Sequence, residues 1–429
     1  MKKIKLIVAS IVLLVVIIML LPRIFDLFTN DIEPIDDSDL SLKVILVSDE
    51  DNAYFDLAKI EDVIYQPKEK AKEIQDMIDG KMWDEELAEE IISNNQEAFD
   101  YFYIAVNKPS YQNPFLANPE NLNPHAELPS INPGRRMAQI SSVKALYLAR
   151  QAKVEEAIEE ALSSVYIGQK IEESQASMIE YLVAKSMKEI GLETIQKIVS
   201  SSDLNNHDLI KYASDLNQFY ENEDGFISMS KAEYYYYTFN INAIIEGNID
   251  ALQSLGWGNE GEYMKINYHF RPNKTKELYA ESARYMVENA NEYCNRIQSI
   301  ESKIVIPSSS IGRFLTENIT GKLMFYSSQG ISNSSVGKKC NEDTLVSATQ
   351  ALIAIKAYKN DKGDYPNSLE QLVPDYLSSA PLDYFDGNPL RYSKENRILY
   401  SIGEDSIDSG GSTGEDWKKM PDPTFKINF

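Results

Sequence analysis

The C-terminal part of the chain reads, in order, Lys362-Gly363-Asp364-Tyr365-Pro366, Pro381-Leu382-Asp383, Gly387-Asn388-Pro389-Leu390-Arg391-Tyr392 and Tyr400-Ser401-Ile402-Gly403-Glu404-Asp405. Glycine, proline and aspartate recur in it at short intervals, and these residues mark turns between short strands. We expect strands near Leu390–Tyr392 and Ile398–Ser401, and a helix over Asp343–Asn360 ahead of the first turn. The stretch therefore predicts a small α+β domain in which this helix packs on an antiparallel sheet.

The order of these motifs resembles the globular domain of the major (G-type) pseudopilin of type II secretion systems. There a helix is followed by a G-x-Y-P turn, an L-P-x-D loop, a G-N-P-x-x-Y strand and an S-x-G-x-D calcium loop. The resemblance covers residues 341–429 and implies a pseudopilin-like domain there. Pilins also carry a Gly-Phe cleavage site with a glutamate in the apolar helix that follows, and the start of this chain has neither. We therefore expect a module carried by a larger protein rather than a fibre subunit.

The stretch from Tyr400 to Asp416 gathers carboxylates among serines and glycines. Calcium takes six to eight hard oxygen ligands, and glycine and serine allow the tight turns that bring them together. Because the acids do not follow the EF-hand ligand spacing, composition alone favours a flexible surface loop over a calcium site. The resemblance implies a structural calcium ion bound by Asp405 and Asp416, with Asp408 and the backbone carbonyl of Ile402 as further ligands. Glu404 stands where the family usually has a small residue.

The N-terminus combines Lys2, Lys3 and Lys5 with the uncharged run Leu6–Leu21. This pattern predicts a membrane anchor over residues 1–28, followed by an acidic linker over residues 29–40. A cleaved signal peptide is the alternative, but the run ends without the small residues that cleavage needs. The lysines predict a cytoplasmic N-terminus and an extracytoplasmic bulk, in the inner (cytoplasmic) membrane of a bacterium. The membrane is thus the first predicted partner.

Composition limits the number of domains and the kinds of partner that the chain can have. The chain has 429 residues, 43% of them hydrophobic, which is enough for two or three globular domains. A net charge of −24 argues against a nucleic-acid partner, since phosphate binding needs a basic surface. The only two cysteines, Cys294 and Cys340, fall in the part placed outside the membrane. They could form one disulfide there or remain two buried thiols.

Residues 41–335 are predicted to form an all-α domain, interrupted by a proline-rich loop over residues 107–134. Ala145–Ile158 resembles half of a tetratricopeptide unit, in which small residues let two antiparallel helices approach and Val154-Glu155-Glu156-Ala157 opens the second helix. An ordinary helix pair is the alternative, because no repeat period is visible. Leu42–Val47 could form a short strand. Asn333-Ser334-Ser335 is expected to connect this domain to the tail domain.

Known catalytic motifs do not appear in the sequence. His125, His207 and His269 are scattered, and there is no metal-binding histidine pair, phosphate-binding loop or nucleophile motif. The order of the whole chain is similar to a large group of single-pass bacterial envelope proteins, on the residues Pro34-Ile35-Asp36-Asp37, Leu40, Asn52-Ala53-Tyr54, Pro272-Asn273, the helical hairpin and the tail. We expect a membrane-anchored, non-enzymatic scaffold that binds envelope proteins and is linked to secretion or pilus-type machinery. An envelope hydrolase or carbohydrate-binding protein that uses the helical domain is the alternative.

Overall fold

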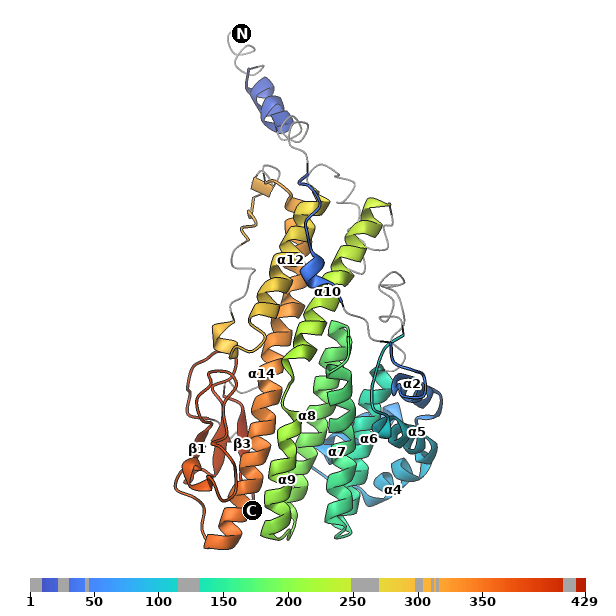
Figure 1. Ribbon diagram of the computed structural model, residues 1–429, viewed down its shortest axis with the longest axis vertical. Helices are drawn as coiled ribbons and strands as arrows, with labels where there is room; N and C mark the ends of the chain where they lie inside the picture. The colour runs from blue at the N-terminus through green and yellow to red at the C-terminus, as the bar shows by residue number, and fades with distance from the viewer. Residues whose placement is uncertain are drawn as a thin grey trace.

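The computed structural model describes residues 10–21, 31–42, 46–114, 131–247, 270–297, 304–309, 312–313, 316–411 and 422–429. It is mainly helical with one small sheet, as predicted (Figure 1). Besides residues 10–21, its α-helices are α2 (Tyr54–Val63), α3 (Ala71–Ile78), α4 (Glu85–Asn94), α5 (Gln96–Asn107), α6 (Ile131–Arg150), α7 (Val154–Glu172), α8 (Met178–Ser201), α9 (Asn206–Asp215), α10 (Glu223–Ile245), α12 (Pro272–Glu288) and α14 (Ile319–Lys362). Short 3-10 turns are η1 (Ser38–Leu40), η2 (Lys68–Lys70), η4 (Leu216–Phe219), η6 (Cys294–Arg296) and η8 (Leu369–Leu372).

Helices α6, α7 and α8 form the centre of the body (Figure 1). The predicted hairpin is present, and α7 begins at Val154 as expected. Glycines set the closeness of α7 and α8: a Cβ on Gly168 would lie 2.7 Å from the carbonyl oxygen of Ala184, and one on Gly191 would lie 2.7 Å from that of Ala161. Small residues therefore allow the two backbones to approach, which is compatible with a helical-repeat architecture.

Helix α14 is continuous over 44 residues, from Ile319 to Lys362. The connector predicted at Asn333–Ser335 is therefore wrong, and the tail helix begins well before Asp343. The upper part of α14 packs on α12, where Phe325 meets Tyr279 with ring centroids 5.2 Å apart. Its lower part lies against α8, α9 and the tail (Figure 1). Packing on both sides stabilises a segment whose serines and glycines have little intrinsic helix preference.

The tail, defined from here on as residues 363–429, contains a three-stranded antiparallel sheet in the order β1-β2-β3. Strands β1 (Arg391–Ser393) and β2 (Ile398–Tyr400) confirm the two predicted strands, and β3 (Thr424–Lys426) is a third that was not predicted. Tyr392 pairs with Leu399, which pairs in turn with Phe425. Leu399 and Phe425 belong to the same buried cluster as Leu192 of α8 and Leu352 of α14. The tail and the helical body thus share one core.

A disulfide joins Cys294 and Cys340. Cys294 follows α12 in η6, and Cys340 lies in the middle of α14. Cys340 is buried against Phe385 and Ile402 of the tail. The covalent link therefore fastens the end of the α12 segment to the point where α14 meets the tail.

Several predicted boundaries differ from the structure. The end of the proline-rich loop, residues 131–134, already belongs to α6, because Pro133 lies in the first turn, where a missing N–H is tolerated. The described residues on either side of the possible strand at 42–47, Leu42 and Leu46-Val47, are not in a strand, and residues 43–45 lie outside the described ranges. The remainder of the proline-rich loop, residues 115–130, also lies outside them.

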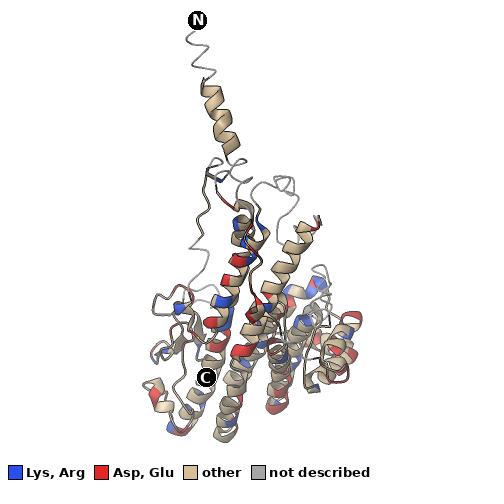
Figure 2. Cartoon of the chain, turned by 45° about the horizontal axis from the view of Figure 1, so that its top comes forward, with Lys and Arg blue, Asp and Glu red and all other residues tan. Residues whose placement is uncertain are grey.

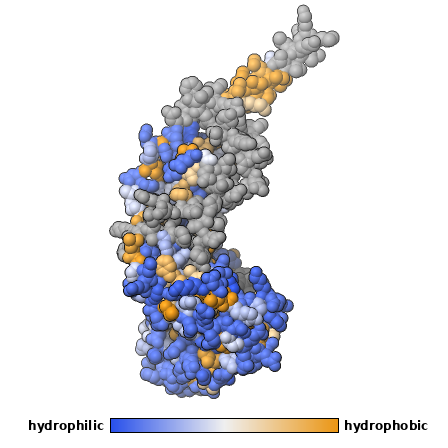
Figure 3. Space-filling model, turned by 90° about the vertical axis from the view of Figure 1, so that its right-hand side faces the viewer, coloured by the Kyte–Doolittle hydropathy of each residue, from blue (hydrophilic) through white to orange (hydrophobic). Residues whose placement is uncertain are grey.

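The described N-terminal helix, residues 10–21, stands apart from the body and forms the most hydrophobic part of the view in Figure 3. Its large apolar residues from Ile11 to Leu21 are all 41–61% exposed, so they pack on nothing else that is described. Within the described ranges, no helix meets the combined length and hydropathy required to cross a membrane. The rest of the predicted anchor lies outside those ranges.

Candidate functional site

The motifs of the tail converge on Asp383, which is fully buried. Its carboxylate accepts hydrogen bonds from the Ser401 hydroxyl (2.8 Å) and the Ile402 backbone N–H (3.0 Å), and it forms an ion pair with Arg391 (2.5 Å). Burial raises the pKa of Asp383 above its usual value, although these hydrogen bonds oppose the change. Three segments with turn-forming sequences are therefore held together by one carboxylate, so Asp383 fixes where the following loop begins.

The acidic loop, defined as residues 402–416, contains the predicted calcium ligands. The side chain of Ile402 is buried in the core beside Cys340. Asp405 and Asp408 are exposed, and each accepts a backbone N–H two residues ahead, from Ile407 and Gly410 respectively, at 3.0 Å. Asp416 lies outside the described residues. Both described aspartates thus lie in local turns, and Oδ2 of Asp408 also lies 3.8 Å from the guanidinium of Arg391.

Asp422, which the sequence did not single out, lies beside this loop and is only 1% exposed. Its Oδ2 accepts the N–H groups of Ser409 and Gly411, both at 2.8 Å. Its Oδ1 is buried and has no hydrogen-bond partner among the described residues. A buried carboxylate oxygen needs a hydrogen-bond donor or a cation as its partner, because leaving it without one costs free energy. Within the ranges that the structure describes, no group of three or more His, Cys, Asp or Glu residues is placed to hold a metal.

A second group of acids lies inside the body. Charged residues of both signs run along the helices (Figure 2), but six of them are buried together where α7, α8 and α14 meet. We call this group the charged cluster; it consists of Glu172, Lys185, Lys188, Glu221, Glu342 and Asp343.

The two lysines are the centres of the charged cluster. Lys185 lies 2.5 Å from Glu172, 3.0 Å from Glu221 and 3.1 Å from Glu342. Lys188 pairs with Glu172 at 2.5 Å and also with Glu342. All of these side chains are at most 3% exposed. Three glutamates therefore pair with two ammonium groups in a space without bulk water, and Asp343 lies beside them, so full ionisation would leave an excess negative charge.

Protonation relieves this excess. Burial and the neighbouring Glu172 raise the pKa of Glu342 well above its usual value. Although burial opposes it, Lys185 and Lys188 lower the pKa of Glu172 to about 2. Both glutamates pair with Lys185 and Lys188, and the opposite directions of their pKa changes favour a proton on Glu342 and a charge on Glu172.

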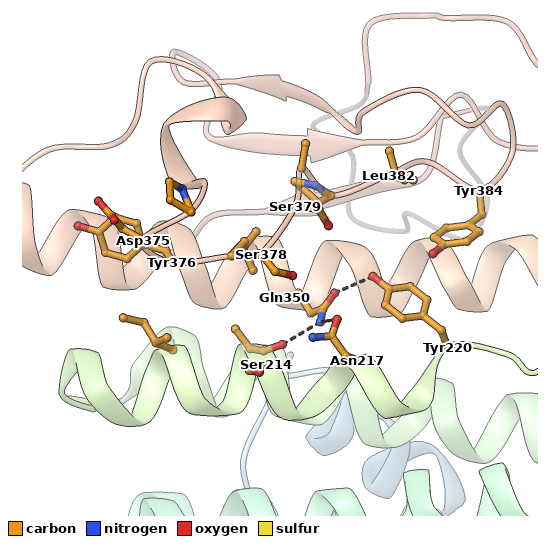
Figure 4. Close-up of a pocket in the computed structure, with 16 residues that line it drawn as sticks. Ser214, Asn217, Tyr220, Gln350, Asp375, Tyr376, Ser378, Ser379, Leu382 and Tyr384 are labelled. Atoms are coloured by element: carbon orange, nitrogen blue, oxygen red, sulfur yellow. Dashed lines mark hydrogen bonds between the residues drawn. The ribbon is translucent and has the colours of Figure 1, made fainter.

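A groove separates α9 from the tail (Figure 4). One wall comes from α9 and η4, the facing wall from the tail segment 374–384, and Gln350 of α14 lies at its base. Its volume is about 250 Å³. Among the lining residues are Tyr220, Tyr376 and Tyr384, with serines on both walls and Asp375 as the only charged residue. We call it the α9–tail groove.

Gln350 organises the base of the α9–tail groove. Its amide nitrogen donates to the carbonyl of Ala213 (2.8 Å) and to Oδ1 of Asn217 (2.9 Å). Its oxygen accepts the hydroxyl of Tyr220 at 2.6 Å. Because the Asn217 oxygen is occupied in this way, the amide nitrogen of that exposed side chain remains available as a donor.

Comparisons with known proteins return no protein family, no curated protein and no solved structure that matches this chain.

Proposed function

We propose that the chain is a membrane-anchored, extracytoplasmic, non-enzymatic scaffold that presents the tail to protein partners in the bacterial envelope, in connection with secretion or pilus-type machinery. The observation that carries this proposal is the continuity of α14, which belongs to the body and supports the tail sheet within one helix. A module fastened in this way has a fixed orientation, which suits a protein that presents a surface.

The proposed location has two supports. The helix over residues 10–21 exposes its apolar side chains, and a bilayer would cover them. The disulfide between Cys294 and Cys340 fits an oxidising compartment outside the cytoplasm. Together with the N-terminal lysines, these features favour a cytoplasmic N-terminus in the inner (cytoplasmic) membrane and an extracytoplasmic bulk.

We also propose that the acidic loop binds a structural calcium ion. Asp405, Asp408 and the Ile402 carbonyl remain candidate ligands, as does Asp416. Oδ1 of Asp422, which has no hydrogen-bond partner among the described residues, supports the proposal because it supplies a buried hard oxygen next to the loop. The ion would supply positive charge that links the loop to the end of the sheet.

The α9–tail groove favours binding over hydrolysis. Glycoside hydrolases use a pair of carboxyl groups on either side of the scissile bond. The lining of this groove contains one, Asp375. The groove therefore does not lead us to propose hydrolysis as its function.

Membrane topology can be tested with single cysteines on the full chain. In a background with Cys294→Ser and Cys340→Ser, we would introduce Lys3→Cys near the N-terminus or Glu395→Cys, which lies in the exposed turn between β1 and β2. A membrane-impermeant maleimide should label Glu395→Cys in intact cells, with the outer membrane permeabilised where one is present. Lys3→Cys should be labelled only after the inner membrane is opened. The reverse pattern, or recovery of the protein in the soluble fraction, would contradict the proposed anchor.

Presentation of the tail can be tested by breaking α14. Photo-crosslinking residues on the tail surface should give a defined set of envelope partners with the wild-type chain. Insertion of two glycines after Lys338, on the body side of the disulfide, should remove those crosslinks while α7 and α8 still fold. The same insertion in the exposed turn at Glu395 is the control. Unchanged crosslinks after the α14 insertion would contradict the scaffold proposal.

A further inference from the structure

The α9–tail groove has a lining that is polar but almost uncharged. Its side chains supply hydroxyl, amide, tyrosine and aliphatic groups, with Asp375 as the one carboxylate and no lysine, arginine or histidine. A phosphate or an acidic ligand would find no cation in this lining. A neutral ligand needs no counter-ion when it leaves water, so the lining selects for uncharged molecules.

Several groups in the groove are free to bind a ligand. Within the described part of the chain, the hydroxyls of Ser214, Ser378 and Ser379 and the Nδ2 of Asn217 make no hydrogen bond to protein atoms. Ser214 and Asn217 lie on one wall, and the other two serines lie on the facing wall (Figure 4). Hydroxyls both donate and accept, whereas the amide nitrogen only donates. This set matches a ligand that has many hydroxyl groups around its edge.

The same groove offers apolar surface between these polar groups. Tyr220 and Tyr384 are half-buried, with ring centroids 5.3 Å apart, and Ile210, Pro374 and Leu382 are among the other apolar residues of the lining. A sugar ring has polar edges and C–H faces, and aromatic rings combined with hydroxyl and amide groups are complementary to both. At about 250 Å³ the groove lies just below the usual range of roughly 300–1,000 Å³ for small-molecule sites, which suits a short segment of a chain.

An extended peptide fits this lining less well. Peptide binding by strand addition needs a straight edge with free backbone groups. Ser378 and Ser379 instead form a bend, and the other wall is a helix followed by a 3-10 turn. We therefore propose that the α9–tail groove binds a neutral oligosaccharide, with Asn217 and the three serines recognising its hydroxyl groups. This proposal does not depend on the anchor or on calcium.

Isothermal titration of the full chain in detergent tests the proposal, with cellotriose, maltotriose and chitotriose as probes. At least one should bind with a Kd of about 1 mM or lower. Asn217→Ala should weaken that binding by about tenfold, since it removes the free donor. Ser214→Trp should abolish it by filling the groove. Gln218→Trp is the matched control, because this exposed neutral residue follows Asn217 but does not line the groove.

The same measurements can overturn the proposal. Binding of none of the three sugars would contradict it, as would equal binding by the Ser214→Trp and Gln218→Trp variants. Because a neutral ligand has no charge for salt to screen, its affinity should be the same at low and high ionic strength, and binding that is lost at high salt would contradict a neutral ligand. Screening an uncharged peptide library under the same conditions distinguishes a peptide ligand from a sugar ligand. If peptides bind in a manner blocked by Ser214→Trp while sugars do not, the groove is a peptide site.

Discussion

The charged cluster and the acidic loop both gather carboxyl groups, but they differ in what surrounds them. In the cluster, Lys185 lies within 3.1 Å of three glutamates, Lys188 pairs with two of them, and the paired side chains are at most 3% exposed. In the loop, Asp408 is 50% exposed and lies 3.8 Å from Arg391. The protein thus neutralises buried acids with its own lysines and protons. In the loop it leaves acids facing water, where a bound ion can act.

The largest expected effect comes from removing a cation of the charged cluster. Lys188→Met should lower the free energy of unfolding by about 3–5 kcal/mol, because Glu172 and Glu342 would lose a buried partner. Denaturant unfolding of the full chain measures this loss. The control is Arg296→Met, which removes an exposed pair with Glu292 and should cost less than about 1 kcal/mol. A similar loss in both variants would show that burial is not what makes the cluster sensitive.

The disulfide tests how firmly the two regions are joined, because Cys340 lies two residues before Glu342 and packs on Ile402. The double variant Cys294→Ser/Cys340→Ser should lose about 2–4 kcal/mol of unfolding free energy, through the added freedom of the unfolded chain. Thermal unfolding with and without a reducing agent measures this effect. Reductant should destabilise the wild-type chain and leave the double variant unchanged. Equal sensitivity of both would mean that the bond does not form in solution.

Calcium removal tests the acidic loop. Saturating calcium should stabilise the full chain relative to excess EDTA, by about 2–3 kcal/mol at a calcium concentration near one hundred times the Kd. Asp422→Asn should remove most of this stabilisation, whereas Asp375→Asn, in the α9–tail groove, should retain it. The full chain is needed because a fragment from residue 341 would lose α8 and α9, which form part of the shared core. Identical melting temperatures in calcium and EDTA would rule out the proposed ion.

The smallest effect is a pH dependence that belongs to the charged cluster. The pKa of Glu342 in the folded chain is above its ordinary value, so the folded state binds the proton more tightly than the unfolded state. The resulting stability is complete below the unfolded pKa, near 4.5, and is lost as pH rises from there through the folded pKa. The slope is at most about 1.4 kcal/mol per pH unit for one group.

Urea unfolding between acidic and mildly alkaline pH measures this slope. Glu342→Gln, which resembles the protonated form, should reduce it. Burial also raises the pKa values of Glu221 and Asp343, so part of the slope should remain. Glu395→Gln, in an exposed turn, should leave the slope as in the wild type. An unchanged slope in Glu342→Gln would mean that Glu342 does not hold the proton.

Local patterns in the sequence were sufficient for much of the fold. The hairpin that opens α7 at Val154 and the strands near Tyr392 and Leu399 follow from helical periodicity and turn residues, which act over a few positions. The upper part of α14 could not be predicted from local patterns, because a serine- and glycine-rich sequence predicts a loop. It is helical because it packs on α12. Strand β3 has only three residues and depends on its pairing with β2.

The sites were harder to predict than the fold. The acidic loop was visible in composition, but Asp422 was not, since its relation to Ser409 depends on the position of β3. The two flanking prolines, Pro421 and Pro423, were the one local feature of the sequence that could have drawn attention to Asp422. The charged cluster joins residues of α7 and α8 to residues of α14 that lie far away in sequence. Such pairings arise only when the helices pack, and no short motif encodes them.

The length of α14 also sets a mechanical property of the molecule. With a rise of 1.5 Å per residue, its 44 residues span about 66 Å. Because one backbone crosses from the α12 end to the tail, a pull or a rotation applied at either end reaches the other without passing through a hinge. The disulfide at Cys340 adds a lateral brace near the midpoint of this rod. The position and the rotational angle of the tail relative to the α12 end are therefore both related through a single helix.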